Sequence, residues 1–502
     1  MEKTATRPRR SGLSKSRITL FEQCPKRLWL SVHGSELSDE TTAVTSSMAV
    51  GHEVGALACA LLPGGHMIEA GRGMGAAVDE TKALLASGWN APIFEATFVH
   101  DDVLIRVDLM IPADGGWHVA EVKSTTGLKE YHLADLATQL WVMRGNGVPI
   151  ASAAIRHLDR SFNLREERDY VGLFADADIA GSVEPIIDGR AAIVSSARDA
   201  LAGPEPVREP GAHCDTPFPC SFKTYCWRDM PPGPEWPAFL LPDIAGKKIA
   251  RDWALKGVDD LRDVPADAMT NDRLRRVHAA TLSGVPYHDA EAIRAETASW
   301  AWPRTYLDFE TIQFAIPRWI GTGPFAQVPF QFSAHIEDAG GALEHREWLS
   351  LDGADPREAC ATALASLPQT GAVIAWNASF ERGCLLKLAD QFPDHAERLR
   401  CLAGRLVDLL PVVRRHYYHR DQRGSWSIKA VLPTIAPDLA YDGLEDVKSG
   451  VDAQVAYFEA IAPETHDVRR EQIRKALLTY CERDTLAMKV VLDRMLGAQS
   501  VA

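Results

Sequence analysis

Three groups of residues in this chain have types and spacings suited to metal chemistry. The first is a set of four cysteines, one near the start and three in the later pattern Cys-x5-Cys-x5-Cys: Cys24, Cys214, Cys220 and Cys226. The second is an acid followed by a Glu-x-Lys motif: Asp108, Glu121 and Lys123. The third combines four acids with a tyrosine: Asp308, Glu310, Glu381, Tyr480 and Asp484. Thiolates select zinc and iron–sulfur clusters, and carboxylates select hard divalent ions, so both kinds of site are expected.

The four cysteines are expected to hold a metal rather than to form disulfides. The chain has 502 residues and nine cysteines, shows no secretory signal, and is expected in the reducing cytoplasm. Four thiolates suffice for an iron–sulfur cluster. Zinc is the alternative, although structural zinc sites favour ligand pairs two to four residues apart, and buried unliganded thiols are a third reading. The remaining cysteines stand in apolar contexts and are expected in the core: Cys59, Cys360, Cys384, Cys401 and Cys481.

Asp108 and Glu121 are expected on neighbouring strands. Residues 103–111 are rich in branched side chains, residues 117–123 have the pattern of a partner strand, and an Asp-Gly-Gly turn separates them. Side chains alternate along a strand, so Glu121 and Lys123 share one face. The two acids would bind one Mg²⁺ or Mn²⁺ ion that activates water, while Lys123 stabilises the developing charge. Glu-x-Lys by itself is more typical of a solvated strand face.

Two helices are expected to complete this first site. Residues 51–62 are predicted as an amphipathic helix with His52 near its first turn, where the imidazole would be either a further metal ligand or a structural group. Residues 132–144 are predicted as a helix that is closed by Gly145 and carries Gln139. His52 and Gln139 are therefore candidate site residues.

Asp308 and Glu310 stand two residues apart on an expected strand, so their side chains project from one face. A second, buried-looking strand runs into a helix start at Glu381. Tyr480 and Asp484 lie one turn apart on a predicted helix, a spacing that is also common on solvated helix faces. Four acids at one site would suit a two-metal phosphodiesterase, whose ions sit about 4 Å apart.

Several further residues are candidate substrate contacts: Asn377, Lys429, Arg414 and Arg415, with Asp408 as a substrate or structural contact. Basic residues also cluster at the start of the chain: Lys3, Arg7, Arg9, Arg10, Lys15, Arg17, Lys26 and Arg27. The formal net charge of −14 is not that of a typical nucleic-acid binder, yet local patches and bound cations decide the field that a polyanion meets. The basic clusters would equally serve as a solvated tail and loop.

The chain is expected to fold into three regions. Residues 14–229 form the first, residues 230–300 form a proline-rich boundary and a helical connector, and residues 301–497 form the third. No apolar run is long enough for a transmembrane helix, so no membrane partner is expected. No Walker-type glycine-rich loop occurs, so no ATPase motor is expected. Nothing indicates a flavin or nicotinamide site, which argues against electron transfer.

Residues 14–227 resemble the RecB-type branch of the PD-(D/E)XK nucleases, particularly CRISPR-associated exonucleases and AddB-type nuclease subunits. The matching positions are Gly51-His52, Asp108, Glu121, Lys123 and Gln139. The resemblance implies an α/β, restriction-endonuclease-like fold and a metal held by His52, Asp108 and Glu121. It also implies a [4Fe–4S] cluster held by one early and three late cysteines, although relatives usually have the first two late cysteines closer together than this chain does.

Residues 301–497 resemble the DEDD exonucleases of the RNase H-like fold, in their tyrosine-containing subgroup. Asp308 and Glu310 match the first motif, residues 377–381 match the second, and Tyr480 with Asp484 match the third. The second motif ends in glutamate here, where the family usually has aspartate. The resemblance implies a two-metal site and a tyrosine that orients the attacking water. The pair of modules also resembles uncharacterised bacterial proteins that join them.

The sequence therefore predicts a metal-dependent nuclease, DNA-directed in preference to RNA-directed, with Mg²⁺ or Mn²⁺ at both carboxylate sites. The alternative is a nucleic-acid-binding or adaptor protein in which one module is catalytically silent. Both interpretations make nucleic acid the partner.

Overall fold

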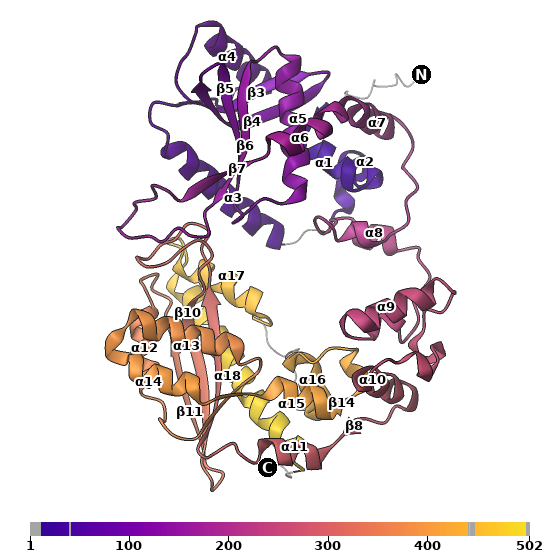
Figure 1. The fold of residues 1–502 in the computed structure, drawn as a ribbon, viewed down its shortest axis with the longest axis vertical. Coiled ribbons are helices and arrows are strands. Elements are labelled where there is room, and N and C mark those ends of the chain that lie inside the picture. The colour runs from indigo at the N-terminus through magenta and orange to yellow at the C-terminus, as the bar shows by residue number, and fades with distance from the viewer. Residues whose placement is uncertain (1–11, 40–41, 440, 442–446, 498–502) are drawn as a thin grey trace. The chain divides into compact units, whose positions relative to one another are not determined.

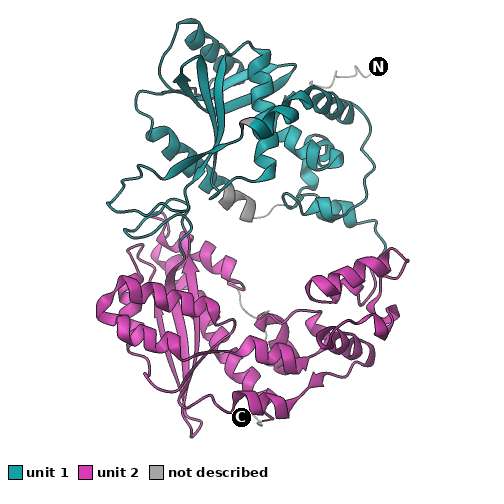
Figure 2. Ribbon diagram, in the orientation of Figure 1, with its two compact units in different colours: residues 1–231, 314–326 teal, residues 232–313, 327–502 magenta. Residues whose placement is uncertain are grey.

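The computed structural model describes residues 12–39, 42–439, 441 and 447–497, and it is a mixed α/β protein. Two compact units divide the chain (Figure 2): residues 1–231 with 314–326 form unit 1, and residues 232–313 with 327–502 form unit 2. Within the described residues, no helix combines the length and the apolar character needed to cross a membrane. The predicted α/β class is confirmed, and each unit is described in turn.

Unit 1 is built on a mixed sheet in the order β2-β3-β4-β5-β6-β7, with β1 beside β4 (Figure 1). Its strands are β1 (Leu13–Ser14), β2 (His66–Met67), β3 (Ile93–His100), β4 (Val103–Ala113), β5 (Gly116–Lys123), β6 (Ile150–Leu158) and β7 (Phe174–Asp178). The predicted hairpin is confirmed, because β4 and β5 pair antiparallel. Its turn depends on glycine: Gly115 has φ 85°, and a Cβ on Gly116 would lie 2.3 Å from the carbonyl oxygen of Pro149.

The helices of unit 1 are α1 (Lys15–Gln23), α2 (Pro25–His33), α3 (Thr42–Ala60), α4 (Met74–Ala86), α5 (Glu130–Gly145), α6 (Ala180–Asp188), α7 (Arg190–Ala202) and α8 (Lys223–Trp227). The predicted helix over 132–144 is confirmed as α5, which packs Leu136 and Leu140 against Ile105 and Val107 of β4 in the main core of the unit. A separate buried cluster contains Ala58 of α3 together with Leu109 of β4 and Ala120 of β5.

The helix expected over residues 51–62 is longer than predicted. It is α3, which begins at Thr42, so His52 lies in the helix interior and the placement near the first turn is wrong. The physical reason is that residues 42–50 contain neither proline nor glycine, and nothing there breaks the helix before Gly51.

Unit 2 contains a five-stranded sheet in the order β11-β10-β9-β12-β13. Its strands are β9 (Arg304–Ile312), β10 (Val328–Glu337), β11 (Leu343–Leu349), β12 (Ala372–Ala375) and β13 (Leu406–Asp408). The strands β9, β10 and β11 pair antiparallel, whereas β12 runs parallel to β9 and β13 runs parallel to β12. In chain order the sheet therefore reads 3-2-1-4-5, with β9 at its centre.

Helices cover both faces of this sheet (Figure 1). They are α12 (Arg357–Ala365), α13 (Ser379–Gln391), α14 (Pro393–Gly404), α17 (Gly450–Ile461) and α18 (Asp467–Met495). The unit also contains α15 (Leu409–His416) and α16 (Ile428–Ile435), which packs against α18. Leu307 and Phe309 of β9 pack with side chains of α12, α13 and α14. The opposite face carries Asp308 and Ser333, and there Thr485 of α18 hydrogen-bonds Ser333. Alternation along β9 thus separates an apolar face from a polar face under α18.

The stretch expected to be a helical connector is largely helical and belongs to unit 2. It contains α9 (Asp243–Ala254), α10 (Asp272–Ser283) and α11 (Ala290–Thr297), together with β8 (Tyr287–His288), which pairs antiparallel with β14 (Tyr417–Tyr418). The side chain of Asn271 caps α10 by accepting from the backbone N–H of Leu274, and Gly284 ends it in the left-handed conformation.

Candidate metal centres

The four predicted cluster cysteines meet around one cavity in unit 1: Cys24, Cys214, Cys220 and Cys226 line it. Cys24 stands between α1 and α2, and Cys226 lies in α8. The loop before α8 is closed by a hydrogen bond from the Cys220 N–H to the Cys214 carbonyl (2.8 Å). All four thiols are free. Because Cys214 and Cys220 line the same cavity, their wide spacing in the sequence does not keep them from one site.

The surroundings of these thiols suit a negatively charged group. Lys26, Arg27 and Arg208 line the same cavity. Burial raises the pKa of the Cys220 and Cys226 thiols, so each would give up its proton on binding a metal. Among the described residues, no three of the cysteine sulfurs lie within 4.8 Å of one another. Four thiolates would serve either a four-iron cluster or one zinc ion.

The first acidic site forms where β4 meets β5. The register that places Leu109 opposite Ala120 makes Asp108 and Glu121 cross-strand neighbours. The backbone N–H of Val122 donates to Asp108 Oδ2 (2.7 Å). The structure therefore brings the two predicted acids together.

Glu121 is the centre of a hydrogen-bonded network. Its Oε1 accepts from Lys15 Nζ (2.5 Å) and Lys123 Nζ (2.9 Å). Its Oε2 accepts from Gln139 Nε2 of α5. Lys123 also donates to Asp135 Oδ2 (2.5 Å). Glu121, Lys123 and Gln139 thus meet as the sequence led us to expect.

The charges within this network are already balanced. Burial would raise the pKa of Glu121, but the ammonium groups of Lys15 and Lys123 outweigh it and lower that pKa. Burial and the charge of Glu121 raise the pKa of Asp108. In the metal-free protein, negative charge therefore stays on Glu121, and Asp108 would lose its proton to solvent when a cation binds.

His52 does not join these acids. Its side chain is exposed on α3. Val54 and Ala58 of the same helix pack in buried clusters that contain Val122 and Ala120, the strand residues that alternate with Glu121. Across the described ranges, no hydrogen bond or ion pair links His52 to Asp108 or Glu121, and no third metal-ligating side chain completes a group with them.

The second acidic site forms where β9 meets α18. Oxygens of Asp308, Glu310 and Asp484 lie within 4.8 Å of one another. Glu310 and Asp484 are buried. Glu381, in the first turn of α13, is also buried, and its Oε2 atom has no hydrogen-bond partner. An unpartnered buried carboxylate oxygen is costly, and a cation would satisfy it.

The carboxylates of the second site repel one another. Burial, followed by the charges of Asp484, Glu310 and Glu381, raises the pKa of Asp308 well above its usual value. Burial raises the pKa of Glu381 to about 8. Burial and Asp484 raise the pKa of Glu310 in the same way. Like charges in one buried site hold protons unless a cation replaces them.

Two tyrosines and a lysine border these acids. Lys429 Nζ of α16 donates to the Tyr480 hydroxyl (2.9 Å). The Tyr441 hydroxyl donates to Asp484 Oδ1. Burial raises the pKa of the Tyr480 hydroxyl, and the charges of Asp484 and Glu310 raise it further, so it stays protonated at neutral pH. Lys429, expected as a substrate contact, here orients Tyr480.

The other expected substrate contacts have different environments. Asn377 adopts a positive φ of 75°, and its N–H donates to Asp408 Oδ1 (3.1 Å), so Asp408 has a structural role. Asn377 and Arg414 line one cavity of about 570 Å³. Arg415 is engaged in an ion pair with Glu296 (2.5 Å).

Sequence reasoning missed several partners of these sites. Lys15 was noted only as part of a basic cluster, although it is the first residue of α1 and its side chain reaches Glu121. Tyr441 carried no spacing signal toward Asp484. Cys481 was expected in the core and is buried there, and its Sγ also lies 3.8 Å from Asp308 Oδ2. When a lysine and an acid are far apart in the sequence, no local pattern indicates that they will be neighbours in the fold.

One family model matches part of the chain. A family model described as a domain of unknown function, DUF2779, matches residues 305–427. The match spans β9 and Glu381 but ends before Lys429, Tyr480 and Asp484, and it covers less than half of the chain. No curated protein matches the sequence.

Proposed function

We propose that this chain is a metal-dependent nuclease with two phosphodiester-hydrolysing modules, acting as a DNA exonuclease. The observation that carries the proposal is the close approach of Asp308, Glu310 and Asp484, whose oxygens lie within 4.8 Å of one another. Such carboxylates repel one another unless cations separate them. Mg²⁺ and Mn²⁺ prefer oxygen ligands of this kind.

The fold of unit 2 supports the RNase H-like interpretation. The central strand β9 carries the first two acids, and the 3-2-1-4-5 strand order places its neighbours β10 and β12 on either side. Glu381 approaches from α13 and Asp484 from α18. Three of the four acids therefore lie together, whereas Glu381 lies outside that group and is near enough for its charge to raise the pKa of Asp308. The resemblance to DEDD exonucleases implies a site built from a central strand and two helices.

The residues of unit 2 have separable roles in the proposed reaction. The three clustered acids and Glu381 would hold the ions, and the ions would supply a nucleophilic hydroxide and neutralise the phosphate. The Tyr480 hydroxyl, protonated at neutral pH, donates a hydrogen bond that orients the attacking water. Lys429 fixes that hydroxyl by donating to its oxygen. Glu381 is one methylene longer than the family's aspartate, and its unpartnered Oε2 atom is available to an ion.

Unit 1 supports the second module. Asp108 and Glu121 would hold one ion, and Gln139 orients Glu121 by donating to its Oε2. Lys123 lies beside the same carboxylate and would stabilise negative charge that develops on the phosphate. His52 has no role in this proposal.

The cysteines fit a [4Fe–4S] cluster, with all four lining one cavity beside three basic side chains. The cluster would tie α1 and α2 to the segment around α8, a structural role like that of other metal staples. The unpaired state of the nine cysteines suits a reducing cytoplasm.

The nuclease proposal is tested on the purified full-length chain with Mn²⁺ or Mg²⁺. End-labelled single strands, duplexes and RNA would be incubated with the parent, Asp308→Ala, Lys123→Ala and the matched control Glu397→Gln, which changes an exposed acid on α14. We expect the two site variants to lose distinguishable activities and the control to keep both. A metal-replete parent that cleaves none of these substrates would contradict the proposal.

The cluster has its own test. Protein purified without air should show broad visible absorbance and four irons per chain. The change Cys226→Ser should lower the iron content and the folded yield, whereas Cys401→Ser, at a half-buried cysteine outside the cavity, should change neither. Colourless, iron-free, fully folded parent protein would remove the cluster from the proposal. A loss of one zinc per chain in Cys226→Ser would then assign a zinc ion to the cysteines.

Two observations favour the alternative for unit 1. Glu121 is already neutralised by two lysines, and His52 is not brought to the site. Unit 1 would then bind nucleic acid without cutting it. Calorimetric titration of Mn²⁺ into the parent and Glu121→Gln distinguishes the two cases, because a silent module gives identical binding curves.

A further inference from the structure

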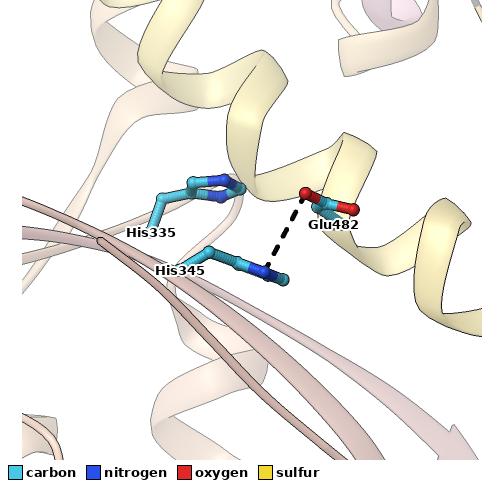
Figure 3. Close-up of side chains that lie close together, drawn as sticks. All are labelled: His335, His345 and Glu482. Carbon is cyan, nitrogen blue, oxygen red and sulfur yellow. Dashed lines mark ion pairs between the residues drawn. The ribbon is translucent and has the colours of Figure 1, made fainter. Parts of the chain in front are cut away.

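Two histidines and a glutamate lie together in unit 2, apart from the acids of the proposed nuclease site. His335 of β10 is the cross-strand partner of His345 of β11, and their rings stack with centroids 4.5 Å apart. Glu482 of α18 reaches the same place, with Oε1 3.9 Å from His345 Nδ1 (Figure 3). One ligand atom from each residue lies within 4.8 Å of the other two.

The second nitrogen of each ring is already occupied by a hydroxyl. His335 Nδ1 hydrogen-bonds Thr485 Oγ1 (2.8 Å), and His345 Nε2 hydrogen-bonds Ser333 Oγ (2.9 Å). The two hydroxyls also bond each other (2.8 Å). Outer partners of this kind fix the tautomer and orientation of metal-binding imidazoles. His335 Nε2 and His345 Nδ1 are the nitrogens left for a ligand.

We propose that His335, His345 and Glu482 form a binding site for a zinc-class transition-metal ion. Two imidazole nitrogens select zinc, cobalt or nickel over Mg²⁺ and Mn²⁺, which prefer oxygen ligands. Three protein ligands leave a fourth position of a tetrahedral ion open to water. Burial, with His345 and Lys489 nearby, lowers the pKa of His335 to about 4, which keeps this imidazole neutral as a ligand must be.

The ion would connect three elements of unit 2. It would link β10 and β11 to α18, the helix that also carries Tyr480 and Asp484. Zinc binding would therefore hold α18 against the sheet. The proposal does not depend on nuclease activity, because neither histidine belongs to the acidic site. It also separates the ions of unit 2 by chemistry, with oxygen ligands for Mg²⁺ or Mn²⁺ and mixed ligands for zinc.

The test counts zinc in the full-length chain. Metal-stripped protein would be dialysed against micromolar zinc with millimolar Mg²⁺ to occupy oxygen-only sites, and zinc per chain would be measured by elemental analysis. The samples are the parent, His345→Ala, Glu482→Gln and the matched control Glu471→Gln, which alters an exposed acid on the same helix. Zinc held by cysteines is common to all four and cancels in the differences.

We expect both site variants to bind one zinc per chain fewer than the parent, while Glu471→Gln keeps the parent's count. Glu482 is half exposed, so Glu482→Gln should retain the parent's circular dichroism spectrum even if His345→Ala does not. Zinc should also raise the thermal midpoint of the parent and of the control, but not that of Glu482→Gln. Equal zinc counts in the parent and both variants would overturn the proposal and leave the histidines as a stacked, hydrogen-bonded pair.

A second variant probes the outer partners. Removing the Ser333 hydroxyl leaves His345 in place but frees its Nε2 atom, so Ser333→Ala should weaken zinc binding about 10–100-fold. Calorimetric titration of zinc into Ser333→Ala and the parent measures this difference. Unchanged affinity would contradict the assignment of His345 Nδ1 as the ligand atom.

Discussion

Unit 1 surrounds its buried carboxylate Glu121 with two ammonium groups, whereas unit 2 crowds further carboxylates around Asp308. In unit 1, Lys15 and Lys123 lower the pKa of Glu121. In unit 2, burial and neighbouring acids raise the pKa of Asp308 well above its usual value. Both units bury acids. Unit 1 balances the negative charge of Glu121 with lysine side chains, whereas in unit 2 the acids around Asp308 are balanced less completely.

The difference bears on what a divalent cation would do in each unit. In unit 2, a cation would relieve repulsion between the carboxylates and satisfy the Oε2 atom of Glu381. In unit 1, a cation would compete with the lysines for Glu121. We infer that unit 2 binds Mn²⁺ more tightly and is stabilised more by it.

The largest expected effect tests whether unit 2 depends on its crowded acids. Asp484→Asn removes one anionic ligand but keeps the size of the side chain, so exonuclease activity assigned to unit 2 should fall about 10²–10³-fold. Cleavage of an end-labelled single strand measures this loss, with Glu397→Gln as the control. Parent-like activity in Asp484→Asn would place the catalytic site elsewhere.

The second prediction contrasts the two units in stability. Lys123→Met removes one of the two cations that neutralise Glu121, so the metal-free chain should lose about 3 kcal/mol of unfolding free energy. Burial and the neighbouring acids keep Asp308 protonated in the metal-free chain, at a cost in stability. Asp308→Asn is always neutral and removes that cost, so it should stabilise the metal-free chain by about 1 kcal/mol or more. Urea unfolding of both variants, followed by circular dichroism, measures the two signs. Destabilisation of similar size in both would erase the contrast between the units.

The sequence predicted local features better than the balance of charge. The hairpin followed from branched residues around Gly115 and Gly116, and the cysteine set followed from residue type and order. The pairing of Lys15 with Glu121 spans 106 positions and depends on how α1 packs on the sheet, which no local pattern encodes. His52 was predicted near the first turn of its helix because the helix was expected to begin at Gly51, whereas α3 begins at Thr42.

The same limit applies in unit 2. Acids on β9 and α18 were found because a family motif links Asp308 and Asp484 across a long separation. No sequence motif includes Tyr441, His335 or His345. The register of β10 with β11 makes the two histidines neighbours, and the packing of α18 brings Asp484 to Tyr441. Tertiary packing, rather than local propensity, decides which polar side chains share a site.

A third prediction concerns Tyr480 and is smaller. Tyr480→Phe removes one hydrogen bond to the attacking water, so the turnover assigned to unit 2 should fall about tenfold, the rate equivalent of one hydrogen bond of about 1.4 kcal/mol. Mn²⁺ affinity should remain within about twofold, because the hydroxyl is not a metal ligand in this proposal. Tyr441→Phe is the comparison, since its hydroxyl contacts Asp484 instead. A tenfold weaker Mn²⁺ affinity in Tyr480→Phe would make Tyr480 part of the ion site.

The smallest expected effect is the pH dependence of the metal-free chain. Glu381 has a folded-state pKa of about 8, above its ordinary value near 4.3, so the folded protein binds more protons than the unfolded chain between these two values. The stabilising contribution of the protonated form is therefore complete below about pH 4 and is lost as the pH rises through about 8. Glu310 shifts in the same direction. From pH 7 to pH 8 the thermal midpoint should fall by about 2–4 °C relative to Glu381→Gln, the change that about 1 kcal/mol produces in a domain of about 150–250 residues. Saturating Mn²⁺ should reverse this relative fall, because a cation replaces the protons. Parallel midpoints for parent and variant across this range would mean that Glu381 is ionised in the metal-free protein, and the contrast between the units would then rest on Asp308 and Glu310.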